Sequence, residues 1–120
     1  PVDIYNHGEM ARDFTYIDNA VSANLLACSA PGDQCTGRVF NCATGERITL
    51  NQTFEALKKL TGYSGKMKYA PEREGDIKHS LADISLAQKH LGYKVLVNFE
   101  SGLQRTVEWY KNQRQPVGAL

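Results

Sequence analysis

RDFTYIDNAVSANLLACSAPG, residues 12–32, is the stretch that decides the fold. Residues 12–17 carry aromatic and β-branched side chains at alternate positions, which predicts a strand. From Asp18, a suitable N-cap, the apolar residues keep the i, i+3, i+4 spacing of one helical face until Pro31 and Gly32 end it. A strand that leads directly into a helix is the basic unit of an α/β fold.

Short strands are expected on both sides of this unit. The segment VDIY at 2–5 has a strand-like composition, and RVFNCA at 38–43 is a short apolar run bounded by glycines, as in a buried strand. KMKYA at 66–70 alternates like a half-exposed strand.

Three further helices are expected from capping residues and apolar spacing. They follow the capping box Thr49–Gln52, the N-cap Asp83, and the apolar series Phe99, Leu103, Val107 and Tyr110. Gly62 and Gly92 are placed to end the first two. About three short strands for four helices are few for a self-sufficient parallel sheet, although the class is α/β.

Length and composition indicate a single domain over residues 1–120, with residues 112–120 as a flexible tail. Apolar residues make up 42% and charged residues 22% of the chain, with a net charge of +1, so disorder and a nucleic-acid-binding polycation are both disfavoured. No apolar run approaches the roughly 18 residues of a membrane span, and the first residues lack the apolar core of a signal peptide. We therefore expect a soluble, cytoplasmic chain that binds no membrane.

The titratable residues do not predict a metal or a nucleophile. Cys28, Cys35 and Cys42 are odd in number and lack CxxC spacing, so reduced and mostly buried thiols are expected rather than disulfides or zinc. The three histidines are scattered, and His79 is expected to be a hydrogen-bonded structural residue. No catalytic residue is assigned.

The run Arg73-Glu74-Gly75-Asp76 has the chemistry to recognise a phosphate beside a ribose. A guanidinium makes bidentate contacts to phosphate oxygens, whereas a carboxylate accepts hydrogen bonds from sugar hydroxyls. Gly75 can adopt a positive φ and let both side chains point the same way. The alternative is a solvated charged turn.

Arg12 is the other candidate for anion binding, because it stands at the mouth of the strand predicted for residues 12–17. Its alternative is a surface ion pair with Glu9 or Asp13.

Four motifs taken together resemble a known family. NHGEMARDFTYID, VFNCATGE, REGDIKHSLADISLAQKHLGY and ESGLQRTVEWY follow one another, over roughly residues 1–111, as in the carboxyl-terminal part of the nucleotide-sugar epimerases of the extended short-chain dehydrogenase/reductase family. The first motif is similar to UDP-glucuronate 4-epimerases, and GDIKHSLADIS is similar to UDP-glucose and UDP-N-acetylhexosamine 4-epimerases.

The resemblance implies a site for a UDP-sugar. Arg12 and Arg73 would clamp the nucleotide diphosphate, and Asp76 would accept from the ribose. The sequence departs from the family at Glu74, where proline is common, and at Asn19, where a second aspartate is common. Neither change removes an expected ligand-binding side chain.

The family's NAD-binding and catalytic motifs are absent from these residues. No GxGxxG turn occurs, and none of the six tyrosines is followed four residues later by lysine, so no YxxxK pair is present. NAD would therefore belong to a Rossmann domain elsewhere in a parent enzyme, and the start at Pro1 indicates a chain that begins inside something longer.

Three functions remain open on the sequence. The chain is interpreted as the UDP-sugar-binding part of an NAD-dependent nucleotide-sugar 4-epimerase, although a dehydratase parent would use the same architecture. It could instead be a free-standing, non-catalytic UDP-sugar-binding domain, or one that assembles with a partner chain supplying the NAD half. An inactive fragment would self-associate through its exposed docking surface.

Overall fold

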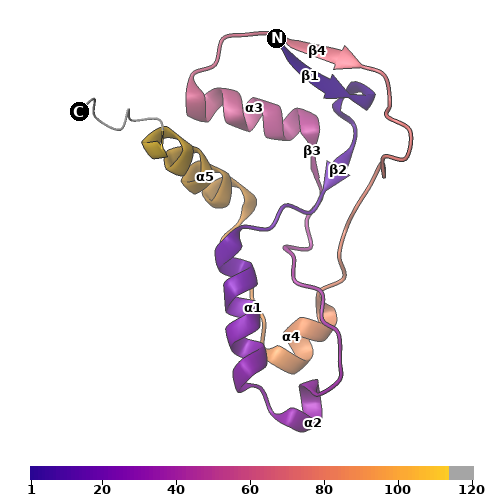
Figure 1. The fold of residues 1–120 in the computed structure, drawn as a ribbon, viewed down its shortest axis with the longest axis vertical. Coiled ribbons are helices and arrows are strands. Elements are labelled where there is room, and N and C mark those ends of the chain that lie inside the picture. Colours follow the sequence, from indigo (N-terminus) through magenta and orange to yellow (C-terminus); the bar gives the residue numbers. More distant parts are fainter. Residues whose placement is uncertain (114–120) are drawn as a thin grey trace, which may run out of the picture.

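The structure, a computed structural model, describes residues 1–113 and has the α/β class expected from the sequence (Figure 1). Its elements in chain order are β1 (Val2–Tyr5), the 3-10 turn η1 (Asn6–Gly8), β2 (Ala11–Arg12), α1 (Ile17–Ser29), α2 (Gly32–Cys35), β3 (Ile48–Thr49), α3 (Leu50–Thr61), β4 (Met67–Ala70), α4 (Ser85–Leu91) and α5 (Phe99–Gln113). The strands form two separate pairs: β1 lies parallel to β4, and β2 lies antiparallel to β3.

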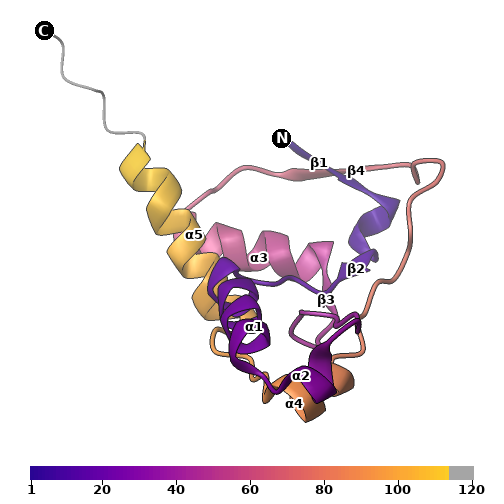
Figure 2. The same ribbon diagram turned by 60° about the horizontal axis from the view of Figure 1, so that its bottom comes forward.

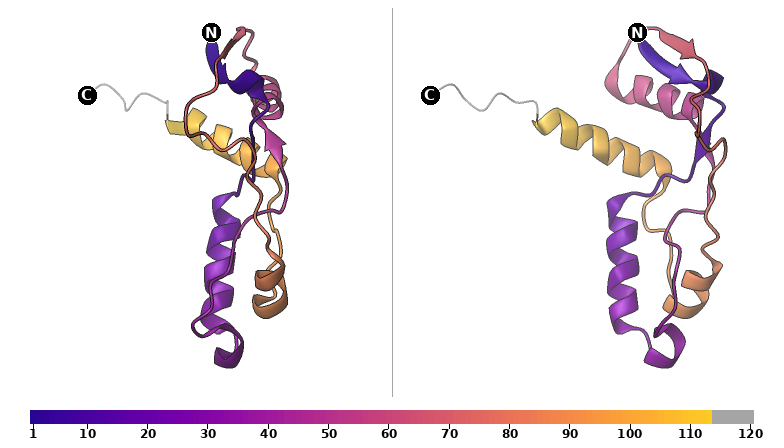
Figure 3. Two further views of the ribbon diagram at one scale, coloured as in Figure 1. Left: turned by 90° about the vertical axis from the view of Figure 1, so that its right-hand side faces the viewer. Right: turned by 45° about the vertical axis from the view of Figure 1, so that its right-hand side comes forward.

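The molecule is open rather than compact. Its principal extents are 53 × 46 × 22 Å, and its radius of gyration is 17.9 Å, against about 14 Å for a compact chain of this length. β1, β4 and α3 lie at one end, α1, α2 and α4 lie at the other, and α5 extends from between them (Figures 1 and 3). The narrow edge-on view in Figure 3 shows that no continuous central sheet joins the two ends within residues 1–113.

A buried amide fixes α1 to the segment before α5. Asn19 is 0% exposed, and its Nδ2 donates to the carbonyl of Val97 at 2.8 Å. Its Oδ1 accepts from the backbone N–H groups of Leu96 at 2.8 Å and Val97 at 3.0 Å. Three of its four hydrogen-bonding positions are thus used, which is what a fully buried amide requires.

A small apolar cluster joins α1 to α4. Its buried members are Ala23, Ala87, Leu91 and Tyr93. The Tyr93 hydroxyl donates to the carbonyl of Ala43 at 2.7 Å and so anchors the loop before β3. Burial raises the pKa of Tyr93 above its usual value, and the neighbouring Cys42 and Asp13 raise it further.

Two strands predicted from the sequence are wrong. In residues 12–17 only Arg12 is paired, and the helix begins at Ile17 with Tyr16 as its N-cap, so Asp18 lies within the first turn. Residues 38–43 form no strand either. A strand needs a partner, and nothing within residues 1–113 pairs with these segments beyond Arg12.

The predicted helix ends are largely confirmed. Thr49 and Gln52 form the reciprocal capping box at the start of α3, and Gly62 ends that helix in the left-handed conformation with φ of 70°. The N-cap of α4 is Ile84 rather than the predicted Asp83, although the carboxylate of Asp83 accepts from the N–H of Ser85 in the first turn. Gly92 follows that helix with φ of 67°.

The expectation for the cysteines is wrong in part, and the expected tail lies mostly outside the described residues. The thiols are free, but Cys28 is exposed and Cys35 and Cys42 are only half-buried, so the expectation of mostly buried thiols is wrong. Helix α5 continues to Gln113, two residues into the range expected as tail, and the remainder of that range lies outside the described residues. No helix within residues 1–113 has the length and apolarity to cross a membrane. The cytoplasmic location stays a prediction.

Asn19→Ala is expected to destabilise the fold by about 2–4 kcal/mol, because buried backbone groups at Leu96 and Val97 lose their partner. Urea unfolding followed by circular dichroism measures the change. Asn24→Ala is the matched control on the same helix, since its exposed amide donates only to Ala20, and we expect it to stay within about 0.5 kcal/mol of the wild type. Equal stabilities for the two variants would contradict the anchoring role of Asn19.

Tyr93→Phe is expected to flatten the loss of stability at alkaline pH. A tyrosine whose folded pKa is raised ionises first in the unfolded chain, so its contribution is complete below its ordinary pKa of about 10 and declines above it. Unfolding free energies between pH 8 and 11 test this. A wild type and a variant with the same slope above pH 10 would show that Tyr93 is not the group responsible.

Candidate functional site

Arg12 lies at the end of β2, where it is fixed by the backbone rather than by an ion pair. It pairs with Ile48 of β3, and its Nη1 donates to the carbonyl of Ala11 at 2.8 Å. The ion pairs formed among residues 1–113 do not include Arg12, so the expected alternative of a salt bridge with Glu9 or Asp13 is not observed. Among residues 1–113, most of its guanidinium donors have no partner.

Asp13, the next residue, is an organising residue that the sequence analysis missed. Its carboxylate accepts from the N–H and the hydroxyl of Thr44 at 2.9 and 2.6 Å, and from the N–H of Gly45 at 2.9 Å. Phe14 follows and packs against Phe99 of α5, with ring centroids 5.6 Å apart. Asp13 therefore binds the loop at Thr44 and Phe14 packs on α5, and these two contacts fix the backbone next to Arg12.

The second candidate group forms a tight turn after β4. The N–H of Asp76 donates to the carbonyl of Arg73 at 3.2 Å, and Gly75, the third residue of the turn, has φ of 85°. A closing hydrogen bond with a positive φ at the third position is the arrangement of a type II turn, which favours glycine there. The positive φ predicted for Gly75 is confirmed.

The guanidinium of Arg73 lies over an aromatic ring. Its Cζ is 3.7 Å from the ring centroid of Tyr5 at the end of β1. The polar, hydrogen-bonding contact with the side chain of Tyr5 raises the pKa of Arg73 above its usual value, and the nearby carboxylate of Asp76 raises it further, so the group remains a permanent cation. Arg73 and Asp76 thus come from one turn, as the sequence predicted, while Tyr5 was not foreseen.

The segment that follows the turn lies next to β2, the strand that carries Arg12. The N–H of Ala11 donates to the carbonyl of Lys78 at 2.9 Å, and the N–H of Ser80 donates to the carbonyl of Ala11 at 3.1 Å. The backbone of His79 lies opposite Ala11 while its side chain is exposed. Within residues 1–113 no direct interaction joins the side chain of Arg12 to that of Arg73 or Asp76.

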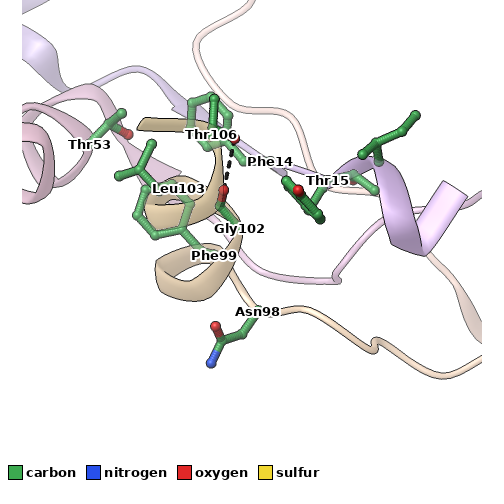
Figure 4. A pocket seen from close by; sticks show the side chains of 10 residues that line it. Phe14, Thr15, Thr53, Asn98, Phe99, Gly102, Leu103 and Thr106 are labelled. Carbon is green, nitrogen blue, oxygen red and sulfur yellow. Dashed lines mark hydrogen bonds between the residues drawn. The ribbon is translucent and has the colours of Figure 1, made fainter. Parts of the chain in front are cut away.

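The cavity between α5 and residues 14–17 is not part of this site. A cavity of about 310 Å³ is lined by aromatic, aliphatic and threonine side chains, among them Phe14, Tyr16, Phe99, Leu103 and Thr106 (Figure 4). Gly102 allows α5 to approach closely here, because a Cβ at that position would lie 2.9 Å from the Cβ of Tyr16. A hollow without charged walls does not suit a diphosphate.

No group of three or more histidine, cysteine, aspartate or glutamate side chains in residues 1–113 is arranged to hold a metal ion. The candidate groups are the guanidinium groups of Arg12 and Arg73 and the carboxylate of Asp76, with their supporting contacts.

No protein-family profile matches the chain. It does match individual proteins. The UDP-glucuronate 4-epimerase of Thermodesulfobacterium geofontis is 36% identical to it over 121 residues, which cover 100% of this chain and 36% of that protein. The chain spans about a third of the length of the first curated relatives it matches.

Solved structures agree with the sequence matches. The UDP-glucose 4-epimerase of Thermotoga maritima with UDP-glucose superposes with a TM-score of 0.86 at 40% identity, over 93% of this chain and 35% of that one. The UDP-glucuronic acid 4-epimerase of Bacillus cereus, in complex with UDP-glucuronic acid and NAD, gives a TM-score of 0.86 at 28% identity, over 94% of this chain and 36% of that one.

Proposed function

Because the chain belongs to the extended short-chain dehydrogenase/reductase epimerases, as a carboxyl-terminal part of one, we propose that it forms the UDP-sugar-binding part of an NAD-dependent nucleotide-sugar 4-epimerase. The observation that carries the proposal is the turn at residues 73–76, which places the guanidinium of Arg73 and the carboxylate of Asp76 on one short loop. The match of nearly the whole chain to an epimerase structure with UDP-glucose supports it.

The proposed chemistry is recognition and orientation. Arg73 and Arg12 donate to the diphosphate, and Asp76 accepts from the ribose hydroxyls. Holding the nucleotide end of the substrate orients the sugar toward groups supplied by the rest of the parent enzyme, and orientation is a large part of such catalysis. The formal net charge of the chain is only +1, so these local arginines have to supply the attraction.

The residues present do not fit NAD. A Rossmann site needs a glycine-rich turn from a strand into the N-terminus of a helix, but β1 leads into the short η1 turn and β4 leads into the loop that carries Arg73. We therefore assign NAD to the remainder of the parent, as the Bacillus cereus complex suggests, and derive no hydride transfer from this chain.

Arg73→Ala is expected to weaken UDP binding about 10- to 100-fold, because a charged hydrogen-bond partner of the diphosphate is lost. Isothermal titration with UDP measures the dissociation constant, and we expect the wild-type affinity to fall at higher salt, since both arginines are within reach of solvent ions. The titration uses the longest native protein that carries this sequence, and the 120-residue chain alongside it.

Arg38→Ala is the control for that titration. It removes the same charge at the opposite end of the molecule, where Arg38 contacts His90 at 3.2 Å. Unchanged UDP affinity in Arg73→Ala, or equal weakening by Arg38→Ala, would remove the assignment. Binding by the 120-residue chain alone would mean that the site is already formed within it.

We also propose that the isolated chain associates with a second copy of itself through the apolar face of α1. Ile17, Val21 and Leu25 follow one stripe of the helix and are 62%, 49% and 65% exposed. In Figure 2, α1 lies between α5 and the pair α2 and α4. Contiguous exposed apolar surface of this kind is usually covered in a native assembly.

Sedimentation velocity of the 120-residue chain is expected to show a mass that rises with concentration, because association buries this stripe. Leu25→Glu should shift the association to higher concentration, since it places a charge in the middle of the contact. Ala27→Glu, an exposed position of the same helix away from this stripe, adds the same charge as a control. A monomer at all concentrations would contradict the proposal.

A further inference from the structure

Arg73 is exposed, yet the structure holds it in one place. Within residues 1–113 its guanidinium forms no ion pair, and its partner is the ring of Tyr5 at 3.7 Å. A solvent-exposed arginine samples many rotamers, and it loses this conformational freedom when it binds a ligand. A contact that selects one arrangement in the free protein therefore lowers the cost of binding.

The ring of Tyr5 is itself well placed for this. The parallel pairing of β1 with β4 sets Tyr5 opposite Ala70, only a few residues before Arg73 on the same loop. Ile4, the preceding residue, is 6% exposed and anchors the strand. The position of the ring is thus fixed by backbone pairing rather than by the loop that it supports.

The mode of contact leaves the arginine able to bind. Stacking on an aromatic face uses the flat side of the guanidinium, whereas its five N–H donors lie in its plane and point outward. A carboxylate partner would occupy two of those donors and repel phosphate. An aromatic partner orients the group while keeping its bidentate edge free for an oxyanion.

The turn alone gives Arg73 less support. Its second position is Glu74, whereas type II turns often have proline there, which fixes φ. The closing hydrogen bond from Asp76 to Arg73 is 3.2 Å long, at the upper end of the usual range. The side chain of Arg73 depends accordingly on a contact outside the turn.

We propose that Tyr5 is a positioning residue, which stacks on the guanidinium of Arg73 and presents it to the diphosphate of a nucleotide. The inference rests on the proposed function, because it names how one of the assigned side chains is held. Tyr5 acts through Arg73, so its effect on binding disappears when Arg73 is absent.

A double-mutant cycle on UDP affinity tests the role. Tyr5→Leu is expected to weaken UDP binding about two- to fivefold, the size of an exposed cation–π contact. Tyr5→Phe keeps the ring and should bind like the wild type. In an Arg73→Ala background, Tyr5→Leu should have no further effect. Additive losses would overturn the proposal, because Tyr5 would then contact the ligand independently of Arg73.

Nuclear magnetic resonance tests the stack without any ligand. The side-chain protons of Arg73 should show an upfield ring-current shift that Tyr5→Leu removes and Tyr5→Phe retains. Backbone amide signals of β1 and β4 report whether the strands still pair in each variant, and Tyr63→Leu, at a different aromatic contact against Phe54, is the control. An unshifted Arg73 in the wild type would overturn the proposal.

The two experiments separate this inference from the proposed function. If the wild type binds no UDP, the proposed function fails and the positioning role fails with it, while the ring-current shift still decides whether the contact exists. If UDP binds and depends on Arg73 but not on Tyr5, the proposed function stands and the inference falls.

Discussion

The arrangement of α1 against the segment before α5 depends on one buried amide, that of Asn19. Its side chain accepts hydrogen bonds from the backbone of Leu96 and Val97, which lie 77 and 78 residues further along the chain. The ion pair between Asp18 and Arg105 links the same region, but both side chains are half exposed. An aspartate could accept from Leu96 and Val97, yet it would face the carbonyl of Val97 without a proton to donate. The asparagine supplies both the acceptor and the donor that these backbone groups require.

Local rules predicted the helix boundaries well and the strands poorly. The capping box at Thr49 and the glycines that follow α3 and α4 act within a few residues, so the sequence contains all the required information. Residues 12–17 and 38–43 have the composition of strands, but a strand also requires a partner, and composition does not supply one. In the first segment, Asp13 and Phe14 are instead committed to Thr44 and Phe99.

The same distinction applies to the candidate site. The turn from Arg73 to Asp76 was predictable because Gly75 determines it locally. Arg12 was selected as the mouth of a strand over residues 12–17, but it is instead the last residue of β2. The supports of both groups were not predictable. Asp13 meets Thr44, 31 residues away, and Tyr5 meets Arg73 only because β1 pairs with β4. The sequence could identify the groups that we propose to face a ligand, whereas the residues that hold them come from distant contacts.

The pairing of β1 with β4 also determines when this loop can form. Val2 pairs with Met67, so during synthesis the first strand has to remain without its partner until about 65 further residues have been made, a delay of roughly 3–13 s at the usual rate of translation. Helix α3, whose contacts are local, can form during that time. Parallel pairing across such a separation is slow for entropic reasons. The stack of Arg73 on Tyr5 therefore has to wait until β4 has been made and paired, and β1 lacks this partner before then.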